Sequence, residues 1–543
     1  MNKYIKTSVL LALGCVALTS CEDLDTEYKG GYATVDQKQA VLNMDPGRAE
    51  AGVTGIASSL NQYMTIYSQH FDFGYAAVML GLDLAGVDMV TNDLGYNHFA
   101  YWCEFLNPNP NGIPTNMCWS TVFKQILACN TNCQSLPADT ENEELQFYRA
   151  QAVGTRAWDY WVLAQLYQFN YAGNESAPCV PIITDVNATE VEVNGAPRAT
   201  VQEVYDQILA DVTEAIDLLT KSGKTPEQMM SSKPKRFISL ATAYGIRARV
   251  YLTMHKYAEA AQDAQQAINT FTGSVLSLDG AAKPGFWSID EADWMWGIPI
   301  NETDRVVTSG IVNWPSMMNT FSASGYVGVG TWKYANSKLY ASIPASDVRK
   351  GWFLDENLQS PILSKVQQDY IDSQDVPCEP YTNVKFAGYN NECNPDRFMN
   401  DIPLMRIEEM YYILAEGQAM SGQTAAGIAT LEGFEKAYRN PDYKCIAATP
   451  EEIQNEIYQK RRVELWGEGL SYFDIMRLDL PIDRTGANYP QAFNLRIPSL
   501  KDSPDRKGEA AVRIYCIPEN EMNGNKAITE NNPWGETPVP VPL

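Results

Sequence analysis

The residues best suited to chemistry in this sequence are aromatic, and they gather in two segments beside amide and carboxylate side chains. An aromatic ring can stack on the C–H face of a sugar, while Asn and Asp side chains hydrogen-bond the hydroxyl groups at its edge. This combination favours a carbohydrate-binding site. The first cluster comprises Tyr96, His98, Phe99, Tyr101 and Trp102, beside Asp88, Asn92, Asp93 and Asn97. The second comprises Trp287, Trp294, Trp296, Trp314, Tyr326, Trp332 and Tyr334.

Each of these rings also has a structural interpretation, because Trp and Tyr in long loops often fill the core beneath them. Trp294 and Trp296 alternate within residues 291–300, a pattern typical of a strand, and this favours a buried position for Trp294. For Trp102, Trp314 and Tyr96 both roles stay open. The predicted ligand-binding residues are Tyr96, His98, Tyr101, Trp102, Asn92, Asp93, Trp287, Trp314, Tyr326 and Trp332.

The sequence lacks the signatures of common enzyme classes. It contains no G-x-S-x-G, no H-E-x-x-H and no phosphate-binding G-x-x-x-x-G-K-[ST] motif. The 66 Asp and Glu residues make chance carboxylate pairs certain, and no motif selects a glycosidase pair among them. Only 3 His residues are present, which disfavours a His-based metal centre, although an oxygen-ligand calcium site stays open. We therefore predict a binding protein without catalytic residues or cofactor.

The charge balance excludes two further classes of partner. Against 41 Lys and Arg stand 66 Asp and Glu, a formal net charge of -25. Nucleic acids and anionic lipid surfaces both require a basic protein face. The hydrophobic fraction of 45% and charged fraction of 20% are typical of a globular chain.

The N-terminus has the pattern of an export and lipidation signal. Lys3 and Lys6 precede an apolar run at residues 9–18, which is too short to span a bilayer. Leu18-Thr19-Ser20-Cys21 resembles a bacterial lipobox, and the acidic run that follows, residues 22–25, resembles the surface-export signal of bacterial surface lipoproteins. We predict that residues 1–20 are a signal peptide, that Cys21 is lipidated, and that residues 21–45 form a tether. Of the nine later cysteines, most are expected to be buried thiols; one or two bridges, such as Cys378–Cys393, stay open.

Helical periodicity organises the rest of the chain. Apolar residues recur at three- and four-residue spacing in segments 48–69, 116–134, 143–169, 200–219, 237–254, 257–270, 402–420, 425–439 and 449–465. Thr200 with Glu203 predicts a capped helix start, as do Thr449 and Pro450 with two following acids. Tyr257-Ala258-Glu259-Ala260 matches a tetratricopeptide-like step. The expected fold is mostly α: a tetratricopeptide-like helix-pair scaffold, mainly 46–70, 116–270 and 402–480, within one body of residues 46–543. Residues 71–115 and 271–400 are expected to be irregular, ligand-binding inserts.

Several motifs resemble those of the SusD/RagB family of outer-membrane nutrient-binding lipoproteins. Residues 460–469, Lys-Arg-Arg-Val-Glu-Leu-Trp-Gly-Glu-Gly, are similar to the family run E-R-R-x-E-L-x-x-E-G, with Lys460 in place of Glu. Residues 472–477 resemble its continuation, although Leu470-Ser471 replaces the usual His-Arg-like pair. The segments 156–161, 180–183, 517–521 and 528–534 resemble further family elements. Charged residues in these motifs are expected to form buried or half-buried ion pairs: Arg461, Arg462, Glu464, Glu468, Asp474 and Arg477.

The resemblance implies a lipid-anchored protein at the cell surface that covers a SusC-like TonB-dependent outer-membrane transporter. Its ligand is expected to be an oligosaccharide or polysaccharide fragment. Two alternatives stay open: capture of a peptide by the same lid arrangement, and a scaffold of an outer-membrane complex that holds no small ligand.

Overall fold

The computed structural model describes residues 33–105, 109–230, 232–503, 508–535 and 537–543. The predicted signal peptide and the predicted lipidation site Cys21 lie outside these residues. Among the described residues, no helix is both long enough and apolar enough to cross a membrane.

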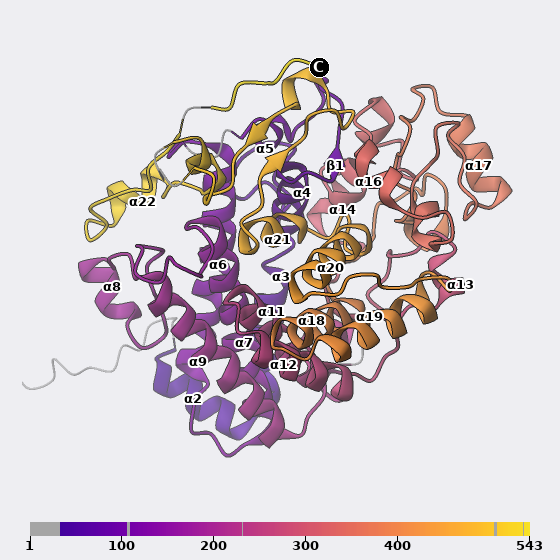
Figure 1. Ribbon diagram of the computed structural model, residues 1–543. Coiled ribbons are helices and arrows are strands. Elements are labelled where there is room, and N and C mark those ends of the chain that lie inside the picture. The colour runs from indigo at the N-terminus through magenta and orange to yellow at the C-terminus, as the bar shows by residue number, and fades with distance from the viewer. Residues whose placement is uncertain (1–32, 106–108, 231, 504–507, 536) are drawn as a thin grey trace, which may run out of the picture.

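A series of packed helices forms the scaffold, as the periodicity predicted (Figure 1). Successive neighbours pack along the chain: α6 on α7, α7 on α9, α11 on α12, α12 on α18, and α18 on both α19 and α20. This arrangement of helix pairs is tetratricopeptide-like. The scaffold helices are α2 (Val35–Met44), α3 (Ala49–Ser58), α6 (Ile113–Ser135), α7 (Glu143–Leu166), α9 (Val201–Ser222), α11 (Leu240–Thr253), α12 (Tyr257–Thr270), α18 (Ile407–Met420), α19 (Thr424–Tyr438), α20 (Pro450–Glu464) and α21 (Ser471–Arg477).

Local sequence explains where these helices begin and how closely they approach. Thr200 accepts a hydrogen bond from the Glu203 amide and the Glu203 side chain returns one to Thr200, so the predicted capping box at α9 is confirmed. The same reciprocal pair forms between Thr449 and Glu452 at α20. Small residues let neighbouring helices come close: Ala260, Ala264 and Ala267 of α12 are fully buried. Helix α7, packed between α6 and α9, is buried from Leu145 to Leu166.

The first insert contains a helix that the periodicity missed. Residues 75–85, expected to be irregular, form α4 (Tyr75–Ala85), and every one of its residues is buried. A helix that is covered on all sides has no polar face, so its sequence shows no amphipathic stripe. The helix expected from residue 402 is also shorter than predicted. Residues 402–406 form strand β4 (Ile402–Arg406), which pairs antiparallel with β2 (Trp294–Ile298), and α18 begins only at Ile407.

The two inserts are joined by a short antiparallel pair, β1 (Met89–Val90) with β3 (Tyr334–Ala335). A further pair, β5 (Ile482–Asp483) with β6 (Arg496–Ile497), lies in the C-terminal region. The remaining elements are short helices: η1 (Pro46–Arg48), α5 (Ala100–Cys103), α8 (Ala188–Asn194), α10 (Pro226–Met229), η2 (Pro234–Arg236), α13 (Leu278–Ala281), α14 (Arg305–Thr308), α15 (Trp314–Met318), η3 (Val327–Val329), α16 (Ser337–Ser342), η4 (Val348–Trp352), α17 (Lys365–Asp372), η5 (Tyr389–Asn391), η6 (Gln491–Phe493), η7 (Glu509–Arg513) and α22 (Glu519–Gly524).

A buried ion-pair network holds the second insert to the helical scaffold. Glu464, at the end of α20, contacts three arginines: Arg439 at 2.7 Å, and Arg406 and Arg349 at 3.1 Å each. Arg349 comes from η4 in the insert and also binds Glu435 of α19 at 2.6 Å. Burial alone would raise the pKa of Glu464, but the facing arginines hold it well below its usual range.

All six motif charges predicted to form ion pairs do so. Arg462 binds Asp88 of the first insert at 2.6 Å, so the same helix, α20, is joined to both inserts. Arg477 lies 2.6 Å from Glu416, and Asp474 receives both Arg461 and Arg477 at 2.7 Å. Glu468 receives Arg406 at 2.8 Å. The nine cysteines after Cys21 are all free thiols, eight of them buried and Cys393 half-buried, so Cys378 and Cys393 do not form a bridge.

Candidate functional site

The two aromatic clusters of the sequence meet on one surface. Rings from the first insert, Tyr96 and His98, lie against Tyr326 of the second, with ring centroids 6.4 Å and 4.7 Å from it. His70, from the loop before α4, completes the group at 5.2 Å from His98 and 5.6 Å from Tyr326. We call these four residues the aromatic surface. Residues 256 positions apart in the chain are thus direct neighbours, with His70 Nδ1 hydrogen-bonded to the Tyr326 hydroxyl.

Backbone pairing and amide side chains position the aromatic surface. The pairing of β1 with β3 places the segment after Val90 beside the segment before Tyr334. The Asn92 side chain connects these two segments. Its nitrogen donates to the Gly330 carbonyl at 3.0 Å, and its oxygen accepts from the Tyr334 hydroxyl at 3.0 Å. The Tyr326 backbone is fixed as well, because its amide donates to Ser316 Oγ and its carbonyl accepts from Thr331.

The sequence did not single out His70, although it is one of only three histidines. Its loop is held by Asp72, whose carboxylate accepts from the Ile66 and Tyr67 amides at 2.7 Å each. The loop turns into α4 at Gly74, where φ is +84°, a conformation that favours glycine. The only signal available beforehand was the scarcity of histidine, and scarcity alone places no residue.

Exposure differs sharply across this surface. Tyr96 is 59% exposed, whereas Tyr326 is only 8% exposed and forms the floor beneath it. Leu94 and Val329 add exposed apolar side chains from the same two loops. A solvent-facing ring above a fixed, hydroxyl-bearing floor can stack on one face of a flat ligand and hydrogen-bond its edge. Tyr101 on α5 is also exposed, at 40%, and packs edge-on against Phe71.

His98 in the surface and Lys333 beneath it both have lowered pKa values. Burial lowers the pKa of His98, and the neighbouring His70 and Lys333 lower it further. The buried His98 Nε2 has no hydrogen-bond partner among the described residues. Lys333 is fully buried, which lowers its pKa to about 7. Its ammonium donates to the Thr331 carbonyl at 2.5 Å. The Thr331 hydroxyl in turn donates to the Tyr326 carbonyl.

Other predicted ligand-binding residues occupy different places. Trp102 is buried against α4, where a Cβ added at Gly81 would lie 2.5 Å from its indole nitrogen. Trp314 is buried against Phe386, and Trp332 is buried with its indole nitrogen donating to the Pro377 carbonyl at 3.0 Å. None of these three rings presents a free face to solvent. Trp294 is buried in β2, as expected, and Trp296 is buried as well: the pairing of β2 with β4 is irregular here, and Trp296 packs edge-on against Trp158 of α7, with ring centroids 5.2 Å apart.

The last two predicted residues, Asp93 and Trp287, are also accessible or partly so. Asp93 is exposed at the edge of the aromatic surface, next to Asn92. Trp287 is half-buried and packs edge-on against Tyr389, in a separate part of the second insert. The described residues contain no group of three or more His, Cys, Asp or Glu side chains placed to hold a metal ion.

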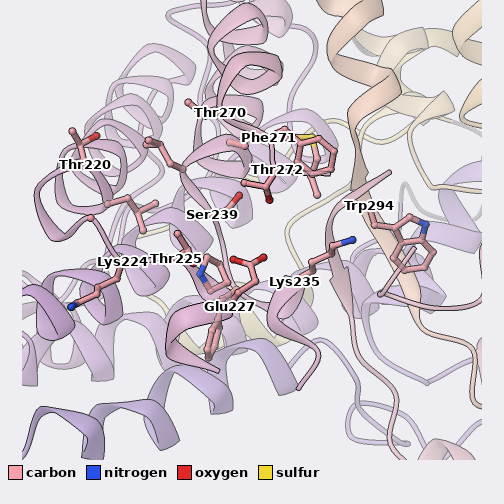
Figure 2. A pocket seen from close by; sticks show the side chains of 17 residues that line it. Thr220, Lys224, Thr225, Glu227, Lys235, Ser239, Thr270, Phe271, Thr272 and Trp294 are labelled. Atoms are coloured by element: carbon pink, nitrogen blue, oxygen red, sulfur yellow. The ribbon is translucent and has the colours of Figure 1, made fainter. Parts of the chain in front are cut away.

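A cavity of about 370 Å³ lies between the end of α9, the start of α11 and the end of α12 (Figure 2). Its inner wall is apolar, with Leu219, Phe237 and Ala241 buried. The surrounding hydroxyls serve the helix ends: Ser239 Oγ caps α11 by accepting from the Thr242 amide, and Thr270 donates to the Gln266 carbonyl. Figure 2 shows Lys224 pointing away from the other labelled side chains, and its ammonium pairs with Glu143 at 3.0 Å. The lining also includes the Glu227 carboxylate and Lys235, whose ammonium donates to the Glu291 carbonyl, but none of its aromatic rings is exposed as Tyr96 is.

Comparison with known proteins identifies the family of this architecture. One family model, described as starch-binding and associating with the outer membrane, matches residues 82–252; a second, the SusD family, matches residues 330–534. The chain belongs to the SusD/RagB family. SusD-like protein P2 of Formosa agariphila is 25% identical over 428 residues, covering 73% of this chain and 75% of that protein. SusD-like protein P38 of the same organism is 21% identical over 407 residues, covering 70% and 75%.

Solved structures of the SusD superfamily share the fold. A SusD-like carbohydrate binding protein from Bacteroides vulgatus superposes with a TM-score of 0.70 at 21% identity, covering 89% of this chain and 97% of that one. A SusD superfamily protein from Bacteroides thetaiotaomicron gives a TM-score of 0.66 at 20% identity, covering 92% of this chain and 100% of that one. The resemblance inferred from the motifs at residues 460–477 is thus confirmed, as is the mostly α, tetratricopeptide-like fold.

Proposed function

We propose that this protein binds a carbohydrate nutrient at the cell surface, on the aromatic surface, and delivers it to a SusC-like TonB-dependent transporter without converting it. Membership of the SusD/RagB family supports nutrient binding in association with the outer membrane. One structural relative is itself named a carbohydrate binding protein.

The observation that carries the proposal is the meeting of two separate loops at Tyr96, His98 and Tyr326. Tyr96 contributes an exposed ring, Tyr326 a buried phenol ring 6.4 Å from it, and His98 a half-buried ring packed on Tyr326. A sugar ring stacks on Tyr96, and its hydroxyls donate hydrogen bonds to the exposed carboxylate of Asp93. These contacts bind and orient a ligand, but they supply no paired acid and base for cleavage.

Attachment to the outer membrane is the second part of the proposal. Cys21, outside the described residues, carries the acyl chains, and two or more such chains hold a protein stably at a bilayer. The body then covers the transporter from outside and releases ligand into it.

The experiment measures glycan binding by calorimetry and affinity electrophoresis. The probes are amylopectin, xylan, yeast mannan and pectic galactan, each with its hexasaccharide. Tyr96→Ala and Tyr326→Ala are expected to weaken binding of the recognised hexasaccharide at least tenfold. Tyr438→Ala, a half-buried tyrosine of α19 in the scaffold, is the matched control and should bind normally.

The outcomes separate the three functions that the sequence left open. Absence of binding to every glycan overturns the carbohydrate proposal, and peptides recovered with the purified transporter complex would then identify peptide capture. Normal nutrient uptake by cells that carry both tyrosine variants would instead favour a scaffold that holds no small ligand.

A further inference from the structure

Trp534 is the one tryptophan that the fold leaves exposed. All twelve tryptophans lie among the described residues; ten are buried, Trp287 is half-buried, and Trp534 is 58% exposed. A large aromatic ring gains most of its stabilising free energy from burial, so an exposed ring keeps a free apolar face that a ligand can cover.

The exposed ring borders an open groove of about 720 Å³ between the exit of α7 and the closing segment of the chain. In the chain, α8 comes shortly before Arg198, and α22 comes shortly before residues 530–534. Figure 1 shows these two helices on the flank opposite α17 of the second insert. The groove shares no residue with the aromatic surface. Its polar lining, around Trp534, consists of Gln168, Arg198, Glu530, Asn531 and Asn532.

Hydrogen bonds hold the groove rigid. Arg198 donates to the Cys179 and Pro178 carbonyls and to Asn532 Oδ1, each at 2.6 Å. Asn532, itself buried, donates to the Tyr167 carbonyl at 2.7 Å and to the Tyr515 carbonyl at 2.8 Å. Asn531 is fixed by the Ile517 backbone, from whose amide it accepts and to whose carbonyl it donates. The backbone just before Trp534 is therefore fixed by the hydrogen bonds of Asn531 and Asn532, and the Trp534 ring faces solvent from this fixed segment.

The chemistry of the lining indicates a sugar. Around a single exposed indole lie a guanidinium, a carboxylate and three side-chain amides, so both charge signs and both hydrogen-bonding roles are present. An acyl chain or an apolar helix would need contiguous apolar surface, which one ring does not provide. A pyranose needs one aromatic face and a polar edge.

We propose that this groove is a second carbohydrate-binding site, in which a sugar ring stacks on Trp534 and its hydroxyls bind Arg198 and the Glu530 carboxylate. The class of ligand rests on the proposed function; the location does not. A polysaccharide long enough to occupy both sites would be retained more strongly than by either site alone, because the second contact is intramolecular.

The test compares Trp534→Ala with Trp534→Phe, and each with Tyr96→Ala, on the same four polysaccharides and their hexasaccharides. Trp534→Ala is expected to reduce retention of the recognised polysaccharide about tenfold or more while the variant keeps the wild-type melting temperature. Trp534→Phe, which retains a stacking face, should restore most of the retention. A double variant with Tyr96→Ala should lose polysaccharide binding altogether.

A direct readout follows from Trp534 being the exposed indole. Iodide should quench part of the tryptophan fluorescence of the wild type, and this quenchable part should be missing in Trp534→Phe. Binding of the recognised polysaccharide should protect it from iodide. Unchanged polysaccharide retention in folded Trp534→Ala, or no protection of the quenched fraction, overturns the proposal. So does loss of transporter association with normal glycan retention, which would make the groove a protein interface.

Failure of this proposal is distinguishable from failure of the proposed function. If Tyr96→Ala binds hexasaccharide normally while Trp534→Ala does not, the groove stands and the aromatic surface falls. If Trp534→Ala is normal and Tyr96→Ala is not, the aromatic surface stands alone.

Discussion

The buried network around Glu464 and the aromatic surface around Tyr326 both collect residues that could do chemistry, yet they differ in how fully those residues are used. In the network each charge faces an opposite charge, and Glu464 alone meets three arginines. On the aromatic surface Tyr96 faces solvent, and so does Asp93 from the same loop. Buried side chains that are paired with opposite charges stabilise the fold, while rings and carboxylates with exposed faces are available to a ligand.

The largest expected effect comes from breaking the network. Glu464→Gln leaves buried arginines without their shared carboxylate, so we expect the free energy of unfolding to fall by about 3–5 kcal/mol. Urea denaturation measures this. Asp369→Asn, which breaks the exposed Lys365–Asp369 pair of α17, is the control and should cost at most about 1 kcal/mol. Equal effects of the two substitutions would mean that burial of the network is not what distinguishes it.

Lys333 gives an intermediate test, because it is buried and no carboxylate among the described residues pairs with it, whereas Lys385 binds Glu468 at 2.6 Å. Burial lowers the Lys333 pKa to about 7 in the folded protein. Between pH 7 and the pKa that Lys333 has in the unfolded chain, the unfolded chain binds more protons than the folded protein. The free energy of unfolding therefore rises with pH in this range. We expect Lys333→Met to be more stable than the wild type at pH 7.

The measurement is urea denaturation at several pH values. The advantage of Lys333→Met should shrink by up to about 1.4 kcal/mol per pH unit between pH 7 and pH 9. Lys385→Met, which removes hydrogen bonds to the Glu464 and Trp466 carbonyls, should be destabilised at every pH. A pH-independent advantage for Lys333→Met would contradict the lowered pKa.

The smallest effect is expected at His98. Its pKa is lowered by burial and by His70 and Lys333, so the neutral ring is favoured, and protonation as the pH falls disrupts its contacts with His70 and Tyr326. NMR titration of the three histidine rings, assigned with His98→Gln, should give His98 a pKa below about 6.5. Glycan binding should weaken several-fold from pH 7 to pH 5, and less so in His98→Gln. A His98 pKa at or above the ordinary value would contradict this view of the site.

Prediction from sequence succeeded where the signal was local. The periodicity of residues 143–169 anticipated α7, and the residue types at Thr200 and Thr449 anticipated both capping boxes. It failed where an element is covered on all sides. Helix α4 shows no stripe because no face is polar.

The same distinction between local sequence signals and long-range burial applies to the candidate site. Tyr96, His98 and Tyr326 were recognised by residue type, but not as neighbours, and His70 was not recognised at all. Trp102, Trp314 and Trp332 have the same chemistry as an exposed ring, so composition alone did not show that they are covered by other parts of the chain.

The sequence by itself determined the helix periods, the caps, the charged motif of α20 and the family, because each depends on residues close together in the chain. Only the tertiary structure decided which aromatic rings face solvent, since exposure depends on what distant segments cover. It brought Tyr96 to Tyr326 through the pairing of β1 with β3, placed His70 of a third loop against the same tyrosine, and left Trp534 uncovered beside its groove.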